Sequence, residues 1–273
     1  MDRTFCYNKT MPEKPPESAE TIPEVLSGKE VANIAAELYQ KIPRKFGAHF
    51  VEPGFILTMA GFKPNTELFH SFADNRELDE VKEDITTINS LLKERGIEFG
   101  FVGEAEEQEG KKMQMFTVEN LRGYERESKT TKIPGVARFE SKDGFDGLMR
   151  WTEETVQGLE EAQKRGEIPQ NFDLMSILQG INKGYPDIVI YDFAKWEAEG
   201  GGAEKIVSVQ IPYVDIYEAP HPTYIVSPEH LEDPEVRRNI EEAGKILKEF
   251  YESDWHQRVS REPDFKAQKP AGT

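Results

Sequence analysis

Residues 172–196 read FDLMSILQGINKGYPDIVIYDFAKW and form the longest apolar-rich stretch of the chain. Within it, four apolar residues recur at the i, i+3, i+4, i+7 spacing of a buried helical stripe: Leu174, Ile177, Leu178 and Ile181. Asp173 is placed to cap the start of this helix, and Gly184 is placed to end it in the left-handed conformation. The stretch therefore predicts a core helix that ends at a Gly-Tyr-Pro turn.

The turn leads into a segment for which the sequence leaves two conformations open. Pro186 suits the first turn of a helix, where its missing N–H is not needed. Residues 187–193, DIVIYDF, are rich in the β-branched residues of buried strands. However, Val189, Phe193 and Trp196 continue at helical spacing, and AKWEAE then leads to a glycine stop. We therefore expect a second helix rather than a strand.

Helices elsewhere carry start and stop signals. Ser27 and Glu30 have the S-x-x-E spacing of a capping box, which predicts a helix after residue 27. A long helix is expected over residues 76–95, with Asp74 or Asn75 as its cap. The last helix of the chain is expected behind the Asp-Pro pair at 233–234.

Strands are expected at 54–62, 97–102, 112–118, 136–140 and 205–217, and residues 67–72 are ambiguous. The connection GEAEEQEG between the second and third of these segments suggests an exposed hairpin. Pro212 places the last one at a sheet edge or at a bulge.

This order of elements predicts an α+β fold: a mostly antiparallel sheet of about four to six strands covered by helices. Strict β-α alternation is absent, which argues against a doubly wound nucleotide fold. No strong linker divides residues 23–256, so we expect a single domain there. Residues 1–22 have the composition of a mobile polar leader, and residues 257–273 that of a polar tail.

The chain is acidic, with 51 Asp and Glu against 34 Lys and Arg and a formal charge of −17. Duplex nucleic acid and anionic membranes are therefore poor partners. The acidic residues are interleaved with basic ones, which favours solubility over mimicry of a nucleic-acid backbone.

The single cysteine, Cys6, cannot form an internal disulfide. No window approaches the ~18 apolar residues of a membrane helix, and the N-terminus lacks a signal-peptide pattern. We expect a cytoplasmic protein.

His49 and Glu52 form an H-x-x-E pair that a turn would place on one side, and His70 follows on the next segment. An imidazole beside a carboxylate suits acid–base chemistry or metal binding. The alternative interpretation is a surface or interface histidine.

The segment PYVDIYEAPHPTY supplies a second candidate, because Tyr213, Asp215 and Tyr217 alternate along an expected strand. Glu218 and His221 follow where that strand would leave the sheet. Such a concentration of polar and aromatic groups suits a pocket wall. The alternative is an edge strand with a half-exposed face.

A local charge inversion supplies the third candidate. Residues 121–138 carry five basic and two acidic side chains in an otherwise acidic chain. Arg122, Tyr124 and Arg126 would bind a small anion there, because the guanidinium offers two donors in one plane. The alternative is a mobile polar loop.

The sequence carries no phosphate-cradling motif, no nucleophile elbow and no helical His pair, so no cofactor and no metal site are predicted. We expect a binding or regulatory protein that recognises a small anionic ligand or a protein partner. The alternative is an acid–base or metal-assisted enzyme with a cleft formed by His221, Asp215 and His49. An acidic interaction protein or a nucleic-acid mimic is a further alternative.

Overall fold

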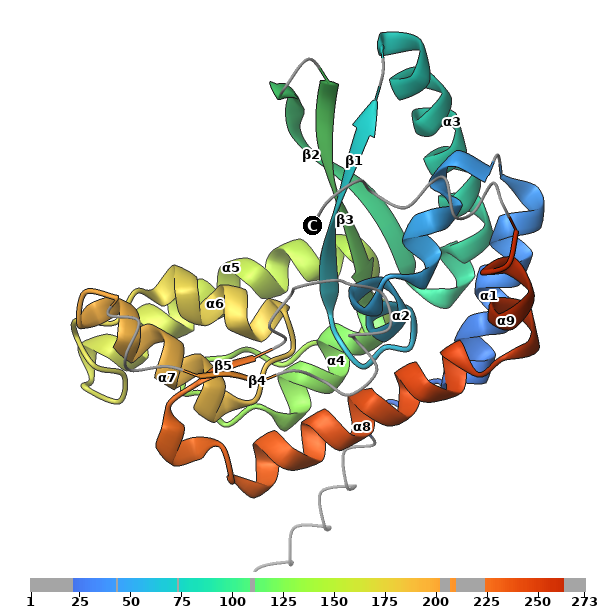
Figure 1. The fold of residues 1–273 in the computed structure, drawn as a ribbon. Coiled ribbons are helices and arrows are strands. Elements are labelled where there is room, and N and C mark those ends of the chain that lie inside the picture. The colour runs from blue at the N-terminus through green and yellow to red at the C-terminus, as the bar shows by residue number, and fades with distance from the viewer. Residues whose placement is uncertain are drawn as a thin grey trace, which may run out of the picture.

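The computed structural model describes residues 22–42, 44–72, 74–108, 111–201, 207–209 and 224–262 of the 273-residue chain (Figure 1). In these ranges the chain forms α-helices (α), 3-10 helices (η) and strands (β). In chain order the elements are α1 (Gly28–Lys41), η1 (Arg44–Val51), α2 (Pro53–Met59), β1 (Asn65–Phe72), α3 (Asn75–Leu92), η2 (Lys93–Arg95), β2 (Ile97–Gln108), β3 (Lys111–Asn120), α4 (Leu121–Thr130), η3 (Ser141–Asp143), α5 (Gly144–Lys164), α6 (Leu174–Asn182), α7 (Asp187–Ala198), β4 (Val207–Val209), β5 (Tyr224–Val226), η6 (Pro228–His230), α8 (Pro234–Tyr251) and α9 (Asp254–Val259).

The α6–α7 pair confirms the two helices expected over residues 172–196. The Asp173 side chain accepts a hydrogen bond from the Met175 N–H, and Gly184 ends the first helix with φ +65°. The second segment is helical, as expected, with Pro186 at the cap rather than inside the first turn. A Cβ on Gly180 would lie 2.7 Å from the Ile190 side chain, so glycine allows the two helices to approach closely.

The predicted capping signals are also confirmed. Ser27 and Glu30 form both hydrogen bonds of the capping box at the start of α1. Asp74 caps α3, and its side chain accepts from the Glu77 N–H. Gly96 follows η2 in the left-handed conformation, with φ +69°, and the chain then enters β2.

The main sheet has three antiparallel strands in the order β1-β3-β2. The expected sheet of four to six strands is not confirmed, because β4 and β5 form a separate two-stranded pair. Of the strand expected over residues 205–217, only β4 lies within the described residues. The ambiguous segment 67–72 belongs to β1. β2 and β3 pair antiparallel, but residues 103–108 of the connection expected to be an exposed hairpin belong to β2, and residues 109–110 lie outside the described residues.

The strand predicted at residues 54–62 is wrong, because this segment forms α2. Pro53 occupies the first turn of α2, as proline does in helix starts. All five side chains from Phe55 to Met59 are buried. A continuous apolar run lacks any periodicity, so it fits a buried helix as well as a buried strand.

The strand predicted at residues 136–140 is also wrong. Side chains rather than a neighbouring strand satisfy its backbone: the Ala137 carbonyl accepts from the Trp151 indole, and the Phe139 N–H donates to the Ser128 hydroxyl. The polar loop considered for residues 121–138 is a helix over most of its length, α4.

The buried apolar side chains form two clusters. One joins α1, α2, α3, α8 and one face of the main sheet, and the other joins α4, α5, α6 and α7. Figure 1 shows α2 and α3 beside the sheet and α5 to α7 extending away from its base. Tyr185, in the turn between α6 and α7, packs against both clusters.

Candidate functional site

The H-x-x-E pair and His70 form a hydrogen-bonded chain, which we call the Glu-His-His chain. The Nδ1 atom of His49 lies 2.5 Å from Oε1 of Glu52. On the other side of the same ring, Nε2 lies 2.7 Å from Nδ1 of His70. The central imidazole thus bridges a carboxylate and a second imidazole.

Local backbone geometry explains the first link. His49 belongs to η1, and in a 3-10 helix the side chains at i and i+3 lie above one another. Glu52 follows η1 and occupies the N-cap position of α2. Its side chain makes no capping hydrogen bond there, because the carboxylate contacts His49 instead.

Strand alternation explains the second link. His70 shares a face of β1 with the buried residues Leu68 and Phe72, and this face is turned toward the helices. It lies opposite the buried Gln114 of β3 in the sheet register. The ring of His70 is 4.9 Å from that of Phe72.

The Glu-His-His chain runs through the protein interior, and its two ends, Glu52 and His70, are more accessible to water than its middle. The side chain of His49 is 5% exposed, whereas that of Glu52 is 38% exposed, and His70 is partly exposed. Tyr251 donates a hydrogen bond to the Val51 carbonyl, and burial followed by the nearby charge of Glu52 raises the pKa of its phenol. The middle of the chain is therefore shielded from water.

The geometry defines the tautomers of the two rings when both are neutral. The Glu52 carboxylate accepts, so Nδ1 of His49 carries hydrogen and Nε2 accepts from Nδ1–H of His70. The acceptor nitrogen of the His70 ring is then Nε2.

This arrangement does not form a metal cage. Both ring nitrogens of His49 point at neighbours on opposite sides, so the three side chains are in line rather than around one point. In the described ranges, no group of three or more His, Cys, Asp or Glu side chains is arranged to hold an ion.

The second candidate from the sequence lies outside the described residues: Tyr213, Asp215, Tyr217, Glu218 and His221. Its proposed combination with His49 therefore stays a prediction.

The third candidate lies on α4, where its three side chains have different surroundings. Arg122 is exposed, whereas Tyr124 is 3% exposed and its hydroxyl accepts from the Asn65 amide. Arg126 donates to the Phe62 carbonyl, pairs with Glu242 at 3.1 Å and lies 4.9 Å from the Phe62 ring centroid. An anion would have to compete with the carboxylate for this guanidinium.

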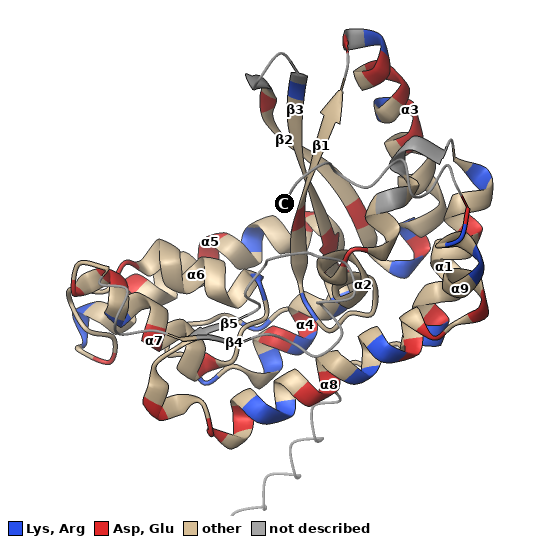
Figure 2. Cartoon of the chain, viewed as in Figure 1, with Lys and Arg blue, Asp and Glu red and all other residues tan. Residues whose placement is uncertain are grey.

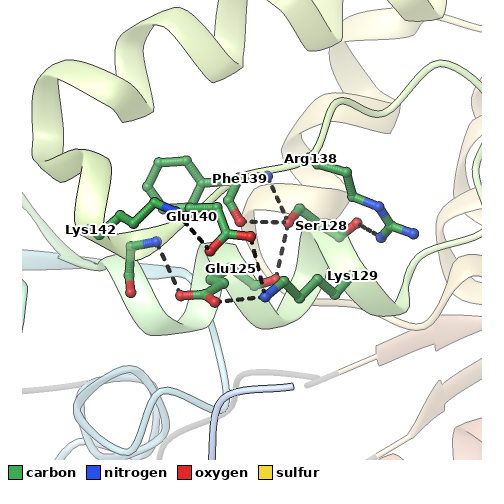
Figure 3. Close-up of polar contacts among 8 residues, drawn as sticks. Glu125, Ser128, Lys129, Arg138, Phe139, Glu140 and Lys142 are labelled. Carbon is green, nitrogen blue, oxygen red and sulfur yellow. Dashed lines mark hydrogen bonds and ion pairs between the residues drawn. The ribbon is translucent and has the colours of Figure 1, made fainter. Parts of the chain in front are cut away.

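Other basic groups of the same region are also engaged (Figure 3). Lys129 pairs with Glu125 at 2.8 Å, and the Arg138 guanidinium donates to the Ser128 carbonyl. Burial by itself raises the pKa of Glu125, but hydrogen bonds from Lys129 and from the Ser141 N–H outweigh it and lower that pKa. Most of the basic groups in this region therefore contact carboxylates or backbone carbonyls of the protein itself.

One carboxylate–imidazole pair escaped the sequence analysis. The Nδ1 atom of His230 lies 2.8 Å from Oδ2 of Asp192, which also accepts from the Ser227 N–H. The Asp192 side chain is 8% exposed and that of His230 is 33% exposed. An acidic residue within the apolar run DIVIYDF could have indicated Asp192 as a candidate, but its partner His230 lies 38 residues away in the sequence.

Charges of both signs alternate along α8, whereas red predominates on α3 (Figure 2). Among the described helices, none combines the length and the apolar character needed to cross a membrane. Comparisons of the chain with protein-family models, with curated proteins and with solved structures find no match.

Proposed function

We propose that this protein is an acid–base enzyme in which His70 exchanges a proton with the substrate. The observation that carries the proposal is the Glu-His-His chain, with contacts of 2.5 and 2.7 Å through a buried imidazole. In this proposal His70 is the catalytic residue, and His49 and Glu52 are positioning residues.

The chemistry follows from the order of donors and acceptors. When Nε2 of His70 takes up a proton, the ring becomes an imidazolium whose Nδ1–H still donates to His49. The Nδ1–H of His49 donates in turn to the Glu52 carboxylate, which stabilises positive charge along the chain. Because His49 is shielded from water, this stabilisation is stronger than it would be at the surface.

The binding of a small anion has less support from the described residues. Arg126 and Lys129 are paired with carboxylates. A surface depression of about 440 Å³ between α1 and α8 is lined by Ser27, three lysines and two glutamates, so its charges nearly cancel. Small-anion binding remains a prediction.

The test uses the hydrolysis of p-nitrophenyl acetate, an activated ester. Nε2 of His70 would take a proton from a water molecule as the water oxygen attacks the ester carbonyl; p-nitrophenolate would leave, acetic acid would form, and the imidazolium would return its proton to the solvent. We expect release by the full chain to fall at least about a hundredfold in H70Q, in keeping with the usual contribution of such groups.

Two further variants separate catalysis from folding. Glu52→Gln retains the shape of the side chain but removes the charge, so we expect an intermediate loss and a changed pH profile. His230→Gln removes the other carboxylate-paired imidazole and serves as the control. Release that survives H70Q but disappears in H230Q would contradict the proposal.

Nitrogen-15 NMR of the histidine rings provides a measurement independent of any substrate. We expect both His49 and His70 to carry hydrogen on Nδ1 at neutral pH. Detection of the Nε2–H tautomer for His70 would show that the lone pair is not where the proposal needs it.

A further inference from the structure

The main sheet has one face that the helices α2 and α3 do not cover, which we call the outer face. Buried residues of the strands point to the other face, as Leu68 and Phe72 do in β1. By alternation, the outer face carries Glu67, Phe69 and Ser71 from β1, all of which are exposed. In Figure 1 the upper parts of the strands stand clear of α5 and α6.

An apolar row crosses all three strands on the outer face. Phe69 lies opposite Met115, and Met115 lies opposite Val102. Phe69 is 58% exposed, and Met115 and Val102 are partly exposed. Antiparallel sheets commonly keep a solvated face polar, so an exposed aromatic residue continuous with two more apolar side chains indicates a contact surface.

A pair of carboxylates lies on the same face below this row. Glu98 of β2 is directly opposite Glu119 of β3. Like charges in this position repel, and burial together with the charge of Glu98 raises the pKa of Glu119. In the described part of the chain no cation is paired with either carboxylate, whereas Glu67 on the same face is paired with Lys183 at 2.9 Å.

We propose that the outer face docks a basic amphipathic helix of a partner protein. Its apolar stripe would cover the row formed by Phe69, Met115 and Val102. A Lys or Arg side chain of the partner would bridge Glu98 and Glu119 and relieve their repulsion. The charge complementarity at this pair is the reason for choosing a basic partner.

The spacing of the two features sets the partner's pattern. Met115 and Glu119 are four residues apart on β3, which corresponds to about 13 Å along a strand. A helix that crosses the apolar row and lies parallel to β3 covers that distance in about nine residues. The partner helix therefore needs its cationic residue about nine positions from the centre of its apolar stripe.

A second copy of this chain fits less well than a basic partner. Symmetric docking would bring the outer face of one copy against that of another. The second copy would present its own Glu98 and Glu119 on the docked face, which adds negative charge to the interface.

The experiment titrates the isotope-labelled full chain with a synthetic amphipathic Leu/Lys helix and follows amide shifts by NMR. We expect the shifts to concentrate on outer-face residues of β1, β2 and β3. Phe69→Ser and Glu98→Gln should each weaken binding about tenfold, the effect of losing a central contact. Both side chains are exposed, so neither variant should unfold the protein.

Matched controls address non-specific attraction to an acidic chain. Ile22→Ser changes an exposed apolar residue that precedes α1, and Glu154→Gln removes an exposed carboxylate of α5. Both should bind as the wild type does, and a scrambled peptide of the same composition should bind at least about tenfold more weakly. Equal binding of the scrambled peptide, or equal losses in the control variants, would overturn the proposal.

Two other possible occupants of the outer face would give different experimental results. A dimer in sedimentation that Phe69→Ser dissociates would show that a second copy covers the face. A rise in peptide affinity of about tenfold after removal of residues 263–273 would show that the chain's own tail does so. Either result would overturn the assignment to a partner protein.

Discussion

Replacement of Lys63 by Met should stabilise the protein at neutral pH. Lys63 is 7% exposed, and its ammonium lies 5.1 Å from the Tyr185 ring centroid. In the described part of the chain it has no carboxylate partner. Burial, and then the charge of Lys183, lower its pKa to about 8.

The size of this stabilisation follows from the difference between the pKa of Lys63 in the folded state and in the unfolded state. A lysine in the unfolded chain has a pKa of ~10.4, so charging Lys63 in the fold costs about 3 kcal/mol. The contact with the Tyr185 ring offsets ~1 kcal/mol of this in the wild type, and Met would lose that contact. Met fills a similar volume, so Lys63→Met should raise the free energy of unfolding by about 2 kcal/mol.

The pH dependence has a definite sign. Because the folded-state pKa of Lys63 is depressed, the wild type gains stability as the pH rises from about 8 to ~10.4. The advantage of the variant should therefore be full below about pH 8 and disappear before the pH reaches ~10.4, because the wild type gains about 3 kcal/mol over this range.

Urea unfolding of both proteins across this range measures the difference. Lys29→Met, at an exposed lysine of α1, is the matched control and should change little at any pH. A Lys63→Met protein that is less stable than the wild type at neutral pH would refute the reasoning. That result would mean that the ammonium makes favourable contacts outweighing its burial.

Three other substitutions test contacts elsewhere in the fold. Gly28→Ala should lower the free energy of unfolding by about 3 kcal/mol, because the added Cβ would lie 2.0 Å from the Ile246 carbonyl oxygen and force α1 away from α8. Urea unfolding measures this loss, and a loss within ~0.5 kcal/mol would contradict the close contact. Glu125→Gln should cost about 1.5 kcal/mol at neutral pH, because it neutralises the nearer of the two carboxylates that Lys129 contacts and leaves Glu140, at 3.6 Å, as the other. Since the folded-state pKa of Glu125 is lowered, this difference should fade below about pH 4, and a pH-independent difference would exclude the ion pair as its cause. Asp192→Asn should cost about 1 to 2 kcal/mol, measured by the same unfolding, because a charged acceptor of two hydrogen bonds becomes neutral; an unchanged stability would show that the contact with His230 is not favourable.

Helix ends were predictable where their signals are local. The capping box of α1 and the left-handed Gly184 after α6 depend on residues within four positions of one another. Such short-range hydrogen bonds form in the same way whatever surrounds the helix. The helix at α7 was predictable for a related reason, because its apolar spacing extends beyond the β-branched run.

Elements without a local period could not be assigned in this way. In α2 every side chain from Phe55 to Met59 is buried, so the apolar run does not distinguish a helix from a strand. The strand wrongly expected at residues 136–140 has its backbone bonded to Ser128, Trp151 and Thr155. Those partners come from α4 and α5, so they cannot be recognised from the sequence of residues 136–140.

The candidate site also combines a contact that the local sequence predicts with contacts that only the tertiary structure shows. The spacing of His49 and Glu52 by itself placed an imidazole beside a carboxylate, because three residues make one turn of a 3-10 helix. Only the tertiary structure brought His70 to the other side of that imidazole, and only it joined Asp192 to His230. Contacts between distant segments depend on how strands and helices pack, and packing is a property of the whole chain rather than of any one segment.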